Sequence, residues 1–150
     1  MKEIAISIAK SDLFAEIALL SAYAGMKNAG GNALFERVAT AKHDEALLER
    51  FWHEFPGILA DTFQGIISSC QCSDTTFSMT IAASGAYDDA LTPSVKTDIF
   101  NAFVAGVAAR WFDVTFPEKA AEWHLKADTL LKSVLSKLSQ RKKPSRTQPS

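Results

Sequence analysis

The residues best suited to chemistry in this chain are two cysteines that stand two positions apart, Cys70 and Cys72. Thiolates at this spacing could bind a metal ion, but a structural zinc site needs four ligands and usually contains two such pairs. The nearest histidine, His53, has no second cluster beside it. We therefore predict that the two cysteines are structural or incidental, and that the chain binds no metal and no cofactor.

The histidines are scattered along the sequence, at His43, His53 and His124. His53-Glu54 lacks the second histidine that a zinc-protease helix requires. The acidic pair Asp88-Asp89 precedes a predicted helix. Aspartates at such positions more often accept backbone hydrogen bonds in a turn than bind a cation. No histidine or acidic pair therefore indicates a catalytic group.

Sequence elements that bind phosphate or carry a nucleophilic serine are also missing. A phosphate-binding loop follows a strand and is completed by Lys-Ser or Lys-Thr. The Gly30-Gly31 pair has neither the strand before it nor the Lys-Ser/Thr after it. No Gly-x-Ser-x-Gly element occurs. We predict no catalytic residues and a protein that is not an enzyme.

A basic segment at the end of the chain is the strongest candidate for a partner-binding site. Composition alone allows a solubilising terminus, or a peptide that becomes ordered on a partner through phosphate or carboxylate contacts. We adopt the second hypothesis. Its candidate residues are Arg141, Lys142, Lys143, Pro144 and Arg146.

The chain has the size and composition of one soluble domain. It has 150 residues, of which 47% are hydrophobic and 22% charged. We divide it into a helical body, residues 1–140, and a basic extended tail, residues 141–150. The net charge is −1, and because the tail carries four positive charges, the body carries −5. An acidic body does not indicate a general nucleic-acid-binding domain, which would present a basic stripe.

Targeting signals are not recognisable in this sequence. The first residues lack the basic region and apolar run of a signal peptide, and no stretch of about 18 apolar residues could form a transmembrane helix. Two cysteines without a disulfide framework fit a reducing compartment. We expect a protein made in a cytoplasm, without a membrane contact.

Hydrophobic periodicity predicts a mainly α protein: a four-helix bundle, a small antiparallel two-stranded β element and an extended C-terminal tail. Alternating apolar residues predict strands at about 3–8 and 76–82, paired with each other. Residues 28–32 and 68–76 are predicted as loops.

Helix signals place the four helices of the bundle. The first helix is capped by Ser11 and ends near Gly25, and the second runs from about 43 to 68, kinked or split at Pro56. The third begins after a Thr92 cap, and its small residues place it at the centre of the bundle. The fourth helix covers about 117–140 and opens with a Thr115–Glu118 capping box.

Two arginine–aromatic triplets lie within predicted helices, at residues 50–52 and 110–112. The aromatic rings are expected in the core, with an anchor in a subunit interface as the alternative. We expect Arg50 and Arg110 to pair with acidic groups or to extend toward solvent.

Several segments together resemble a known group of proteins. They are residues 22–27 (AYAGMK), 35–40 (FERVAT), 44–52 (DEALLERFW), 103–105 (FVA), 110–112 (RWF) and 141–146 (RKKPSR). The group consists of short proteins from phages and prophages of gut bacteria, in the virion-structure gene block. The chain is also broadly similar to phage head–tail adaptor (connector) proteins. Those are small helical bundles, often with a β-hairpin, that form a twelve-fold ring under the portal.

The resemblance implies a structural component of a tailed-phage virion at the head–tail junction, assembled in the host cytoplasm. Its partners would be the portal protein, neighbouring neck and tail proteins and other copies in a dodecameric ring, with DNA present only as channel contents. The tail would dock on the portal or an adjacent ring. Two alternatives are a host cytoplasmic helical interaction module, and an enzyme whose site is assembled from scattered Asp, Glu and His residues.

Overall fold

The computed structural model describes residues 2–27 and 44–140. In chain order the elements are strand β1 (Lys2–Ala9), helix α1 (Lys10–Lys27), helix α3 (Glu45–Thr62), strands β2 (Ile67–Cys72) and β3 (Thr76–Ala83), the short 3-10 helix η2 (Asp89–Leu91), and helices α4 (Thr92–Thr115) and α5 (Pro117–Ser139). The predicted fold class is confirmed: these residues form four helices and a small antiparallel sheet. The predicted loop at 28–32 and the tail at 141–150 lie outside the described residues.

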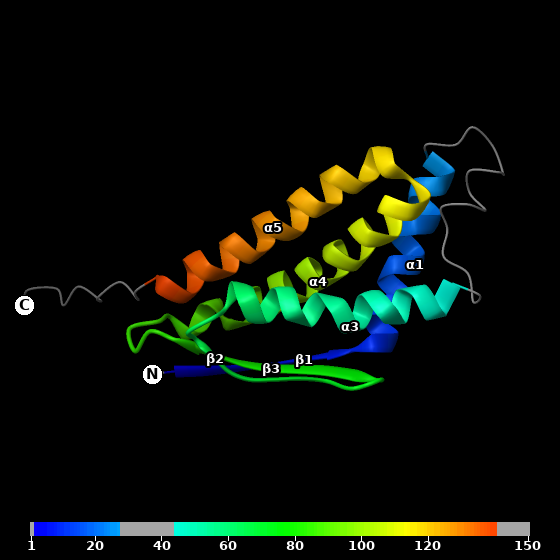
Figure 1. The fold of residues 1–150 in the computed structure, drawn as a ribbon. Helices are drawn as coiled ribbons and strands as arrows, with labels where there is room; N and C mark the ends of the chain where they lie inside the picture. The colour runs from blue at the N-terminus through cyan, green and yellow to red at the C-terminus, as the bar shows by residue number, and fades with distance from the viewer. Residues whose placement is uncertain (1, 28–43, 141–150) are drawn as a thin grey trace, which may run out of the picture.

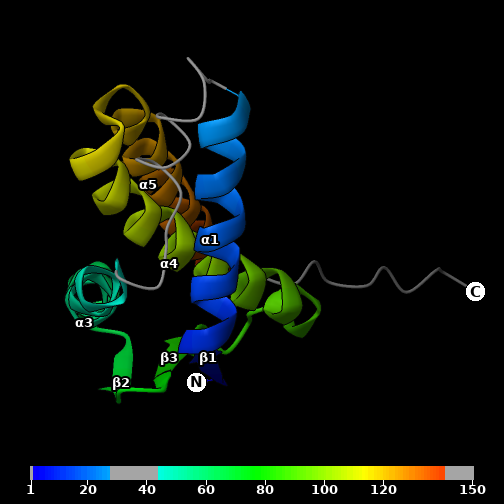
Figure 2. The same cartoon turned by 90° about the vertical axis from the view of Figure 1, so that its right-hand side faces the viewer.

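The sheet has the strand order β1-β3-β2, and both strand pairs are antiparallel. The predicted pairing of β1 with β3 is confirmed, with Ile4 opposite Ile81 and Ile6 opposite Met79. These four side chains are buried, and the residues between them face the other side of the sheet. The helices cover only the buried side, as Figure 1 and Figure 2 show.

Strand β2 corrects the prediction of a loop at 68–76 and of a two-stranded element. It pairs with β3 from Ile67, opposite Ile81, to Cys72, opposite Phe77, with a bulge between Ile67 and Ser69. Because β2 is an edge strand whose residues 68–71 are exposed, no alternation of apolar and polar residues reveals it in the sequence.

Helix α4 passes through the middle of the body, as its small residues predict. All residues from 102 to 109 are buried, and α4 packs against α1, α3, α5 and β1. Helices α3 and α4 are in close contact at Gly106, where an added Cβ atom would overlap the ring of Phe55 in α3. A glycine is therefore required here to let α3 and α4 meet.

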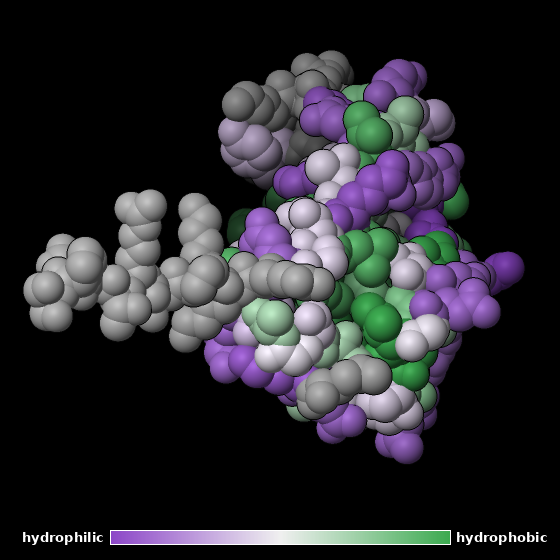
Figure 3. All heavy atoms as spheres, turned by 90° about the vertical axis from the view of Figure 1, so that its left-hand side faces the viewer, coloured by the Kyte–Doolittle hydropathy of each residue, from purple (hydrophilic) through white to green (hydrophobic). Residues whose placement is uncertain are grey.

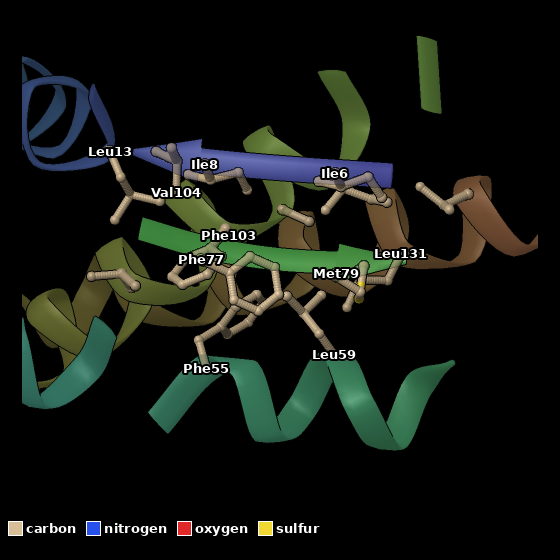
Figure 4. Packing of buried hydrophobic residues seen from close by; sticks show 14 of the residues in the cluster. Ile6, Ile8, Leu13, Phe55, Leu59, Phe77, Met79, Phe103, Val104 and Leu131 are labelled. Atoms are coloured by element: carbon tan, nitrogen blue, oxygen red, sulfur yellow. The ribbon is translucent and has the colours of Figure 1, made fainter. Parts of the chain in front are cut away.

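One aromatic cluster joins α3, α4 and the sheet. The ring of Phe103 in α4 has its centroid 5.1 Å from that of Trp52, 5.0 Å from Phe55 and 5.4 Å from Phe77. Separations of this size are typical of favourable tilted and edge-to-face contacts. Figure 4 shows Phe103 between the helix that carries Phe55 and the strand that carries Phe77.

Helix α3 is shorter than predicted. It is one helix that contains Pro56 and ends at Thr62, so the predicted continuation to residue 68 is wrong. Gly65 then adopts a φ angle of +92°, a left-handed conformation that glycine accommodates most readily. The chain turns there and enters β2.

Helix α1 begins at Lys10, directly after β1, and continues past Gly25, so the predicted cap at Ser11 and end at Gly25 are both wrong. Two contacts of Lys10 fix this junction. Its backbone N–H donates to the carbonyl of Thr75 over 2.9 Å, and its ammonium lies 2.6 Å from Oε1 of Glu49 in α3.

Two threonines predicted as helix caps, Thr92 and Thr115, make other hydrogen bonds in the structure. Thr92 is already inside α4, and its hydroxyl lies 3.1 Å from that of Tyr87. The predicted Thr115–Glu118 capping box does not form, because the Thr115 hydroxyl donates to the Trp111 carbonyl one turn back in α4. Threonine hydroxyls commonly make this bond at helix ends.

Helices α4 and α5 are also joined by polar contacts. The ammonium of Lys137 lies 2.6 Å from Oδ2 of Asp98 and donates to the hydroxyl of Ser94 over 2.5 Å. The side chains of this ion pair are only 24% and 17% exposed, so it is shielded from solvent on most sides. It holds the last turns of α5 against the start of α4.

We expect Gly106→Ala to destabilise the fold, because the new methyl group would overlap the Phe55 ring and force α3 away from α4. Overpacking of this kind costs about 1–3 kcal/mol. Urea denaturation should show the loss. The matched control is Gly57→Ala in α3, where nothing lies within 4 Å of the added Cβ atom. Helix propensity predicts equal or higher stability for the control, so similar losses in both variants would contradict the close contact.

A second prediction concerns acid stability. The Lys10 hydrogen bond and charge lower the pKa of the Glu49 carboxyl. The ion pair therefore adds stability above the pKa of Glu49 in the unfolded chain, and this is lost as the pH falls through the lower folded-state pKa. We expect Glu49→Gln to be less stable than wild type at pH 7, with the difference shrinking as the pH falls and vanishing once the Glu49 carboxyl is protonated in the folded state as well. Denaturation at several pH values tests this, and a difference that stays constant with pH would contradict it.

Candidate functional site

The candidate partner-binding residues of the tail, with His43 and Gly30-Gly31, lie outside the described residues. The structure does place the cysteines. Both are in edge strand β2, opposite residues of β3 that face the helices: Cys70 opposite Met79 and Cys72 opposite Phe77. Cys70 is exposed and Cys72 is half-buried.

Strand β2 brings Cys72 next to His53, a proximity that the sequence did not indicate. Sγ of Cys72 lies 3.9 Å from Nδ1 of His53, and Nε2 of the same ring lies 3.5 Å from Oδ1 of Asp74. A thiol, an imidazole and a carboxylate thus follow one another at the edge of the sheet. These residue types can perform nucleophilic catalysis when the thiol is ionised.

The environment of Cys72 favours the neutral thiol. Burial raises its pKa first of all, and the nearby Cys70 and Asp74 raise it further. The thiol also lies within 3.8 Å of the Trp52 carbonyl oxygen and 3.7 Å of that of Ser73, both acceptors for S–H. A reactive cysteine needs a lowered pKa, so this arrangement does not activate the sulfur. Within the described ranges, no three His, Cys, Asp or Glu residues are placed to hold a metal ion.

The other polar residues considered as candidate site residues make contacts within the fold. His124 in α5 lies 2.8 Å from Asp113 in α4. Oδ1 of Asp88 accepts a hydrogen bond from the Ala90 N–H and caps η2, as the turn hypothesis predicts.

Both arginines pair with one carboxylate, as predicted. Nε of Arg50 lies 3.0 Å from Oε1 of Glu54, and Nε of Arg110 lies 3.8 Å from Oε2. The Arg110 guanidinium carbon is 5.6 Å from the centre of the Phe55 ring. The aromatic residues of the two triplets are buried in the core, which confirms the first expectation for them: Phe51, Trp52, Trp111 and Phe112.

A groove lined by α1, α4 and α5 is one candidate binding surface among the described residues. Its volume is about 250 Å³. Its lining consists of Glu16 and Leu20 from α1, Asn101 and Val104 from α4, and Trp123, Lys126 and Leu130 from α5. The Lys126 ammonium lies 4.6 Å from the centre of the Trp123 ring. We call this feature the α1–α5 groove.

The outer face of the sheet is the second candidate surface. Of the 22 residues in β1, β2 and β3, only Lys2 and Glu3 are charged, although 22% of the chain is. Of these two, Glu3 is exposed and lies on the outer face with Ala5 and Ser7. At one end of this face, a shallow hollow of about 650 Å³ lies between Glu3, Ile67 and Ala82. Figure 3 shows the end of the molecule at which β1 begins, where hydrophobic side chains gather among hydrophilic ones.

No protein-family model, curated protein or solved structure matches this chain. Among the described residues, no helix combines the length and the apolar character that crossing a membrane would require. The functional argument therefore depends on the surfaces described above.

The protonation state of the Cys72 thiol can be tested by measuring the alkylation rate of the Cys70→Ser variant, in which Cys72 is the only thiol of the chain. We expect slow reaction at pH 7 and a rate that rises with pH to a midpoint above that of a free cysteine, because the pKa is raised. Adding His53→Ala should leave the midpoint unchanged. Fast reaction at pH 7 that depends on His53 would instead show an activated thiol.

Proposed function

We propose that this chain is a structural, non-enzymatic component of a tailed-phage virion: a head–tail connector that forms a ring below the portal. The proposal combines the resemblance of its sequence segments to such proteins with a mainly helical body and a small antiparallel sheet. The observation that carries it is the outer face of the sheet, which no described helix covers (Figure 2) and which carries a single charged residue, Glu3, at one end.

A sheet that faces only solvent normally carries polar and charged side chains on its free face. In this chain the exposed positions of β1 and β3 include Ala5, Ser7 and Ser78, and no helix covers them in the described part of the molecule (Figure 2). Charged residues are depleted in the cores of protein interfaces, because burying an unpaired charge is costly. An uncovered face whose only charged residue, Glu3, lies at its end therefore supports an assembly contact.

The size of this face favours an assembly with several contacts per subunit. Three strands about 4.8 Å apart, with about 3.3 Å per residue, cover roughly 14 Å by 26 Å. The resulting area, roughly 350 Å², is well below the about 800 Å² per partner of a standard stable interface. A ring supplies further contacts, since each subunit meets its two neighbours through different patches. In this proposal the tail docks on the portal or on an adjacent ring.

We expect the chain to be present at about a dozen copies per particle, the number that a twelve-fold ring requires. We also expect deletion of residues 141–150 to leave the fold intact and to abolish incorporation. The measurement is quantitative mass spectrometry of purified particles, relative to the major capsid protein, with circular dichroism of each purified chain.

Deletion of residues 147–150 alone is the matched control, because it retains Arg141 to Arg146 and should be incorporated normally. Normal incorporation of the chain that lacks residues 141–150 would contradict the role of the tail. Absence of the full-length chain from particles, with abundance in the lysate, would exclude the virion role and favour a host interaction module.

A further inference from the structure

We propose that the basic tail of one copy of this chain binds in the α1–α5 groove of another copy. This inference rests on the ring assembly of the proposed function, and it gives the tail a binding site on another copy of this chain where the proposed function names the portal or an adjacent ring. Charge, the chemistry of the groove wall and the reach of the chain each support it.

Charge complementarity is the first support. Asp12 and Glu16 lie one turn apart on α1, both are exposed, and neither forms an ion pair with a described residue. Glu16 also forms part of the groove wall. The opposite wall carries the cation Lys126, so the acidic wall of α1 is the side on which a basic segment would bind. The tail supplies four positive charges between Arg141 and Arg146.

The apolar part of the groove fits the rest of the tail sequence. Trp123 is partly exposed in the groove wall, with Leu20 and Leu130 beside it. Extended proline-containing peptides bind in aromatic-lined grooves, and nearby carboxylates bind the basic residues that flank the proline. In the tail, Pro144 follows three consecutive basic residues. The volume of about 250 Å³ is below the roughly 300–1,000 Å³ of small-molecule pockets, and suits a few side chains of an extended peptide.

The reach of the chain indicates that the basic triplet Arg141 to Lys143, as distinct from the more distant Arg146, comes from a second copy. Trp123 and Lys126 lie about 20–24 Å from Ser139, because a helix rises 1.5 Å per residue. An extended chain covers at most about 3.6 Å per residue, so Lys143 stays within about 14 Å of Ser139. The basic triplet therefore cannot reach the Trp123–Lys126 part of its own groove. Figure 1 shows α5 ending at the opposite end of the molecule from α1.

Photo-cross-linking of the full-length chain tests the contact directly. A photoreactive amino acid replaces Asn101, an exposed residue of α4 that lines the groove. Copies labelled with ¹⁴N and ¹⁵N are mixed before assembly, and the cross-linked peptides are identified by mass spectrometry. We expect cross-links to residues 141–150 that join peptides of different labels. Cross-links only within one label, or none to the tail, would overturn the proposal.

A charge exchange provides the second readout. Glu16→Lys should reduce the yield of tail cross-links several-fold, and adding Arg141→Glu, Lys142→Glu and Lys143→Glu should restore it. The control is Asp61→Lys, a reversal at an exposed carboxylate of α3 away from the groove, which should have no effect. Equal losses in Glu16→Lys and the control, or no restoration, would contradict the specific contact.

The two proposals can fail separately. Tail cross-links between copies, in a chain that is absent from particles, would support this contact and exclude the virion role. Normal incorporation of a chain whose tail forms no cross-link to the groove would overturn this contact and leave the virion role in place.

Discussion

The close approach of α3 to α4 at Gly106 is the constraint on which the rest of the structure depends. Without a side chain at this position, the Phe55 ring can lie directly on the α4 backbone. This places Phe103 within contact distance of Trp52 and Phe55, and the same ring meets Phe77 of the central strand. The sheet is therefore attached to the helices through a cluster that forms only when α3 and α4 are this close.

Polar contacts between the described elements complete this arrangement. Ion pairs join α1 to α3 through Lys10 and Glu49, and α5 to α4 through Lys137 and Asp98. Because these charges are engaged between helices, they stabilise the packing of one element on another. The outer face of the sheet takes no part in this packing, and internal stability does not explain why Glu3 is its only charged residue. The proposed assembly contact would explain it.

The sequence predicted those elements whose pattern is set by burial. The alternation in β1 and β3 and the small residues of α4 follow from contacts with the core, and both predictions are confirmed. Strand β2 was not predicted, because an exposed edge strand has no buried face and therefore shows no alternation of apolar and polar residues. The length of α3 was overestimated because Phe63, Ile66 and Ile67 continue the helical spacing, although the helix ends at Thr62 and the chain turns at Gly65. The candidate site could not be predicted either: the groove combines residues of three helices, and Cys72 meets His53 only through the unpredicted strand.

The direct junction of β1 and α1 connects the two candidate surfaces. No loop separates Ala9 from Lys10, and the two contacts of Lys10 hold the junction to the β2–β3 turn and to α3. The strand and the helix are thus one continuous unit that belongs to both candidate surfaces: β1 contributes to the outer face of the sheet, and α1 contributes Glu16 and Leu20 to the groove. A partner bound at either surface would contact this same unit.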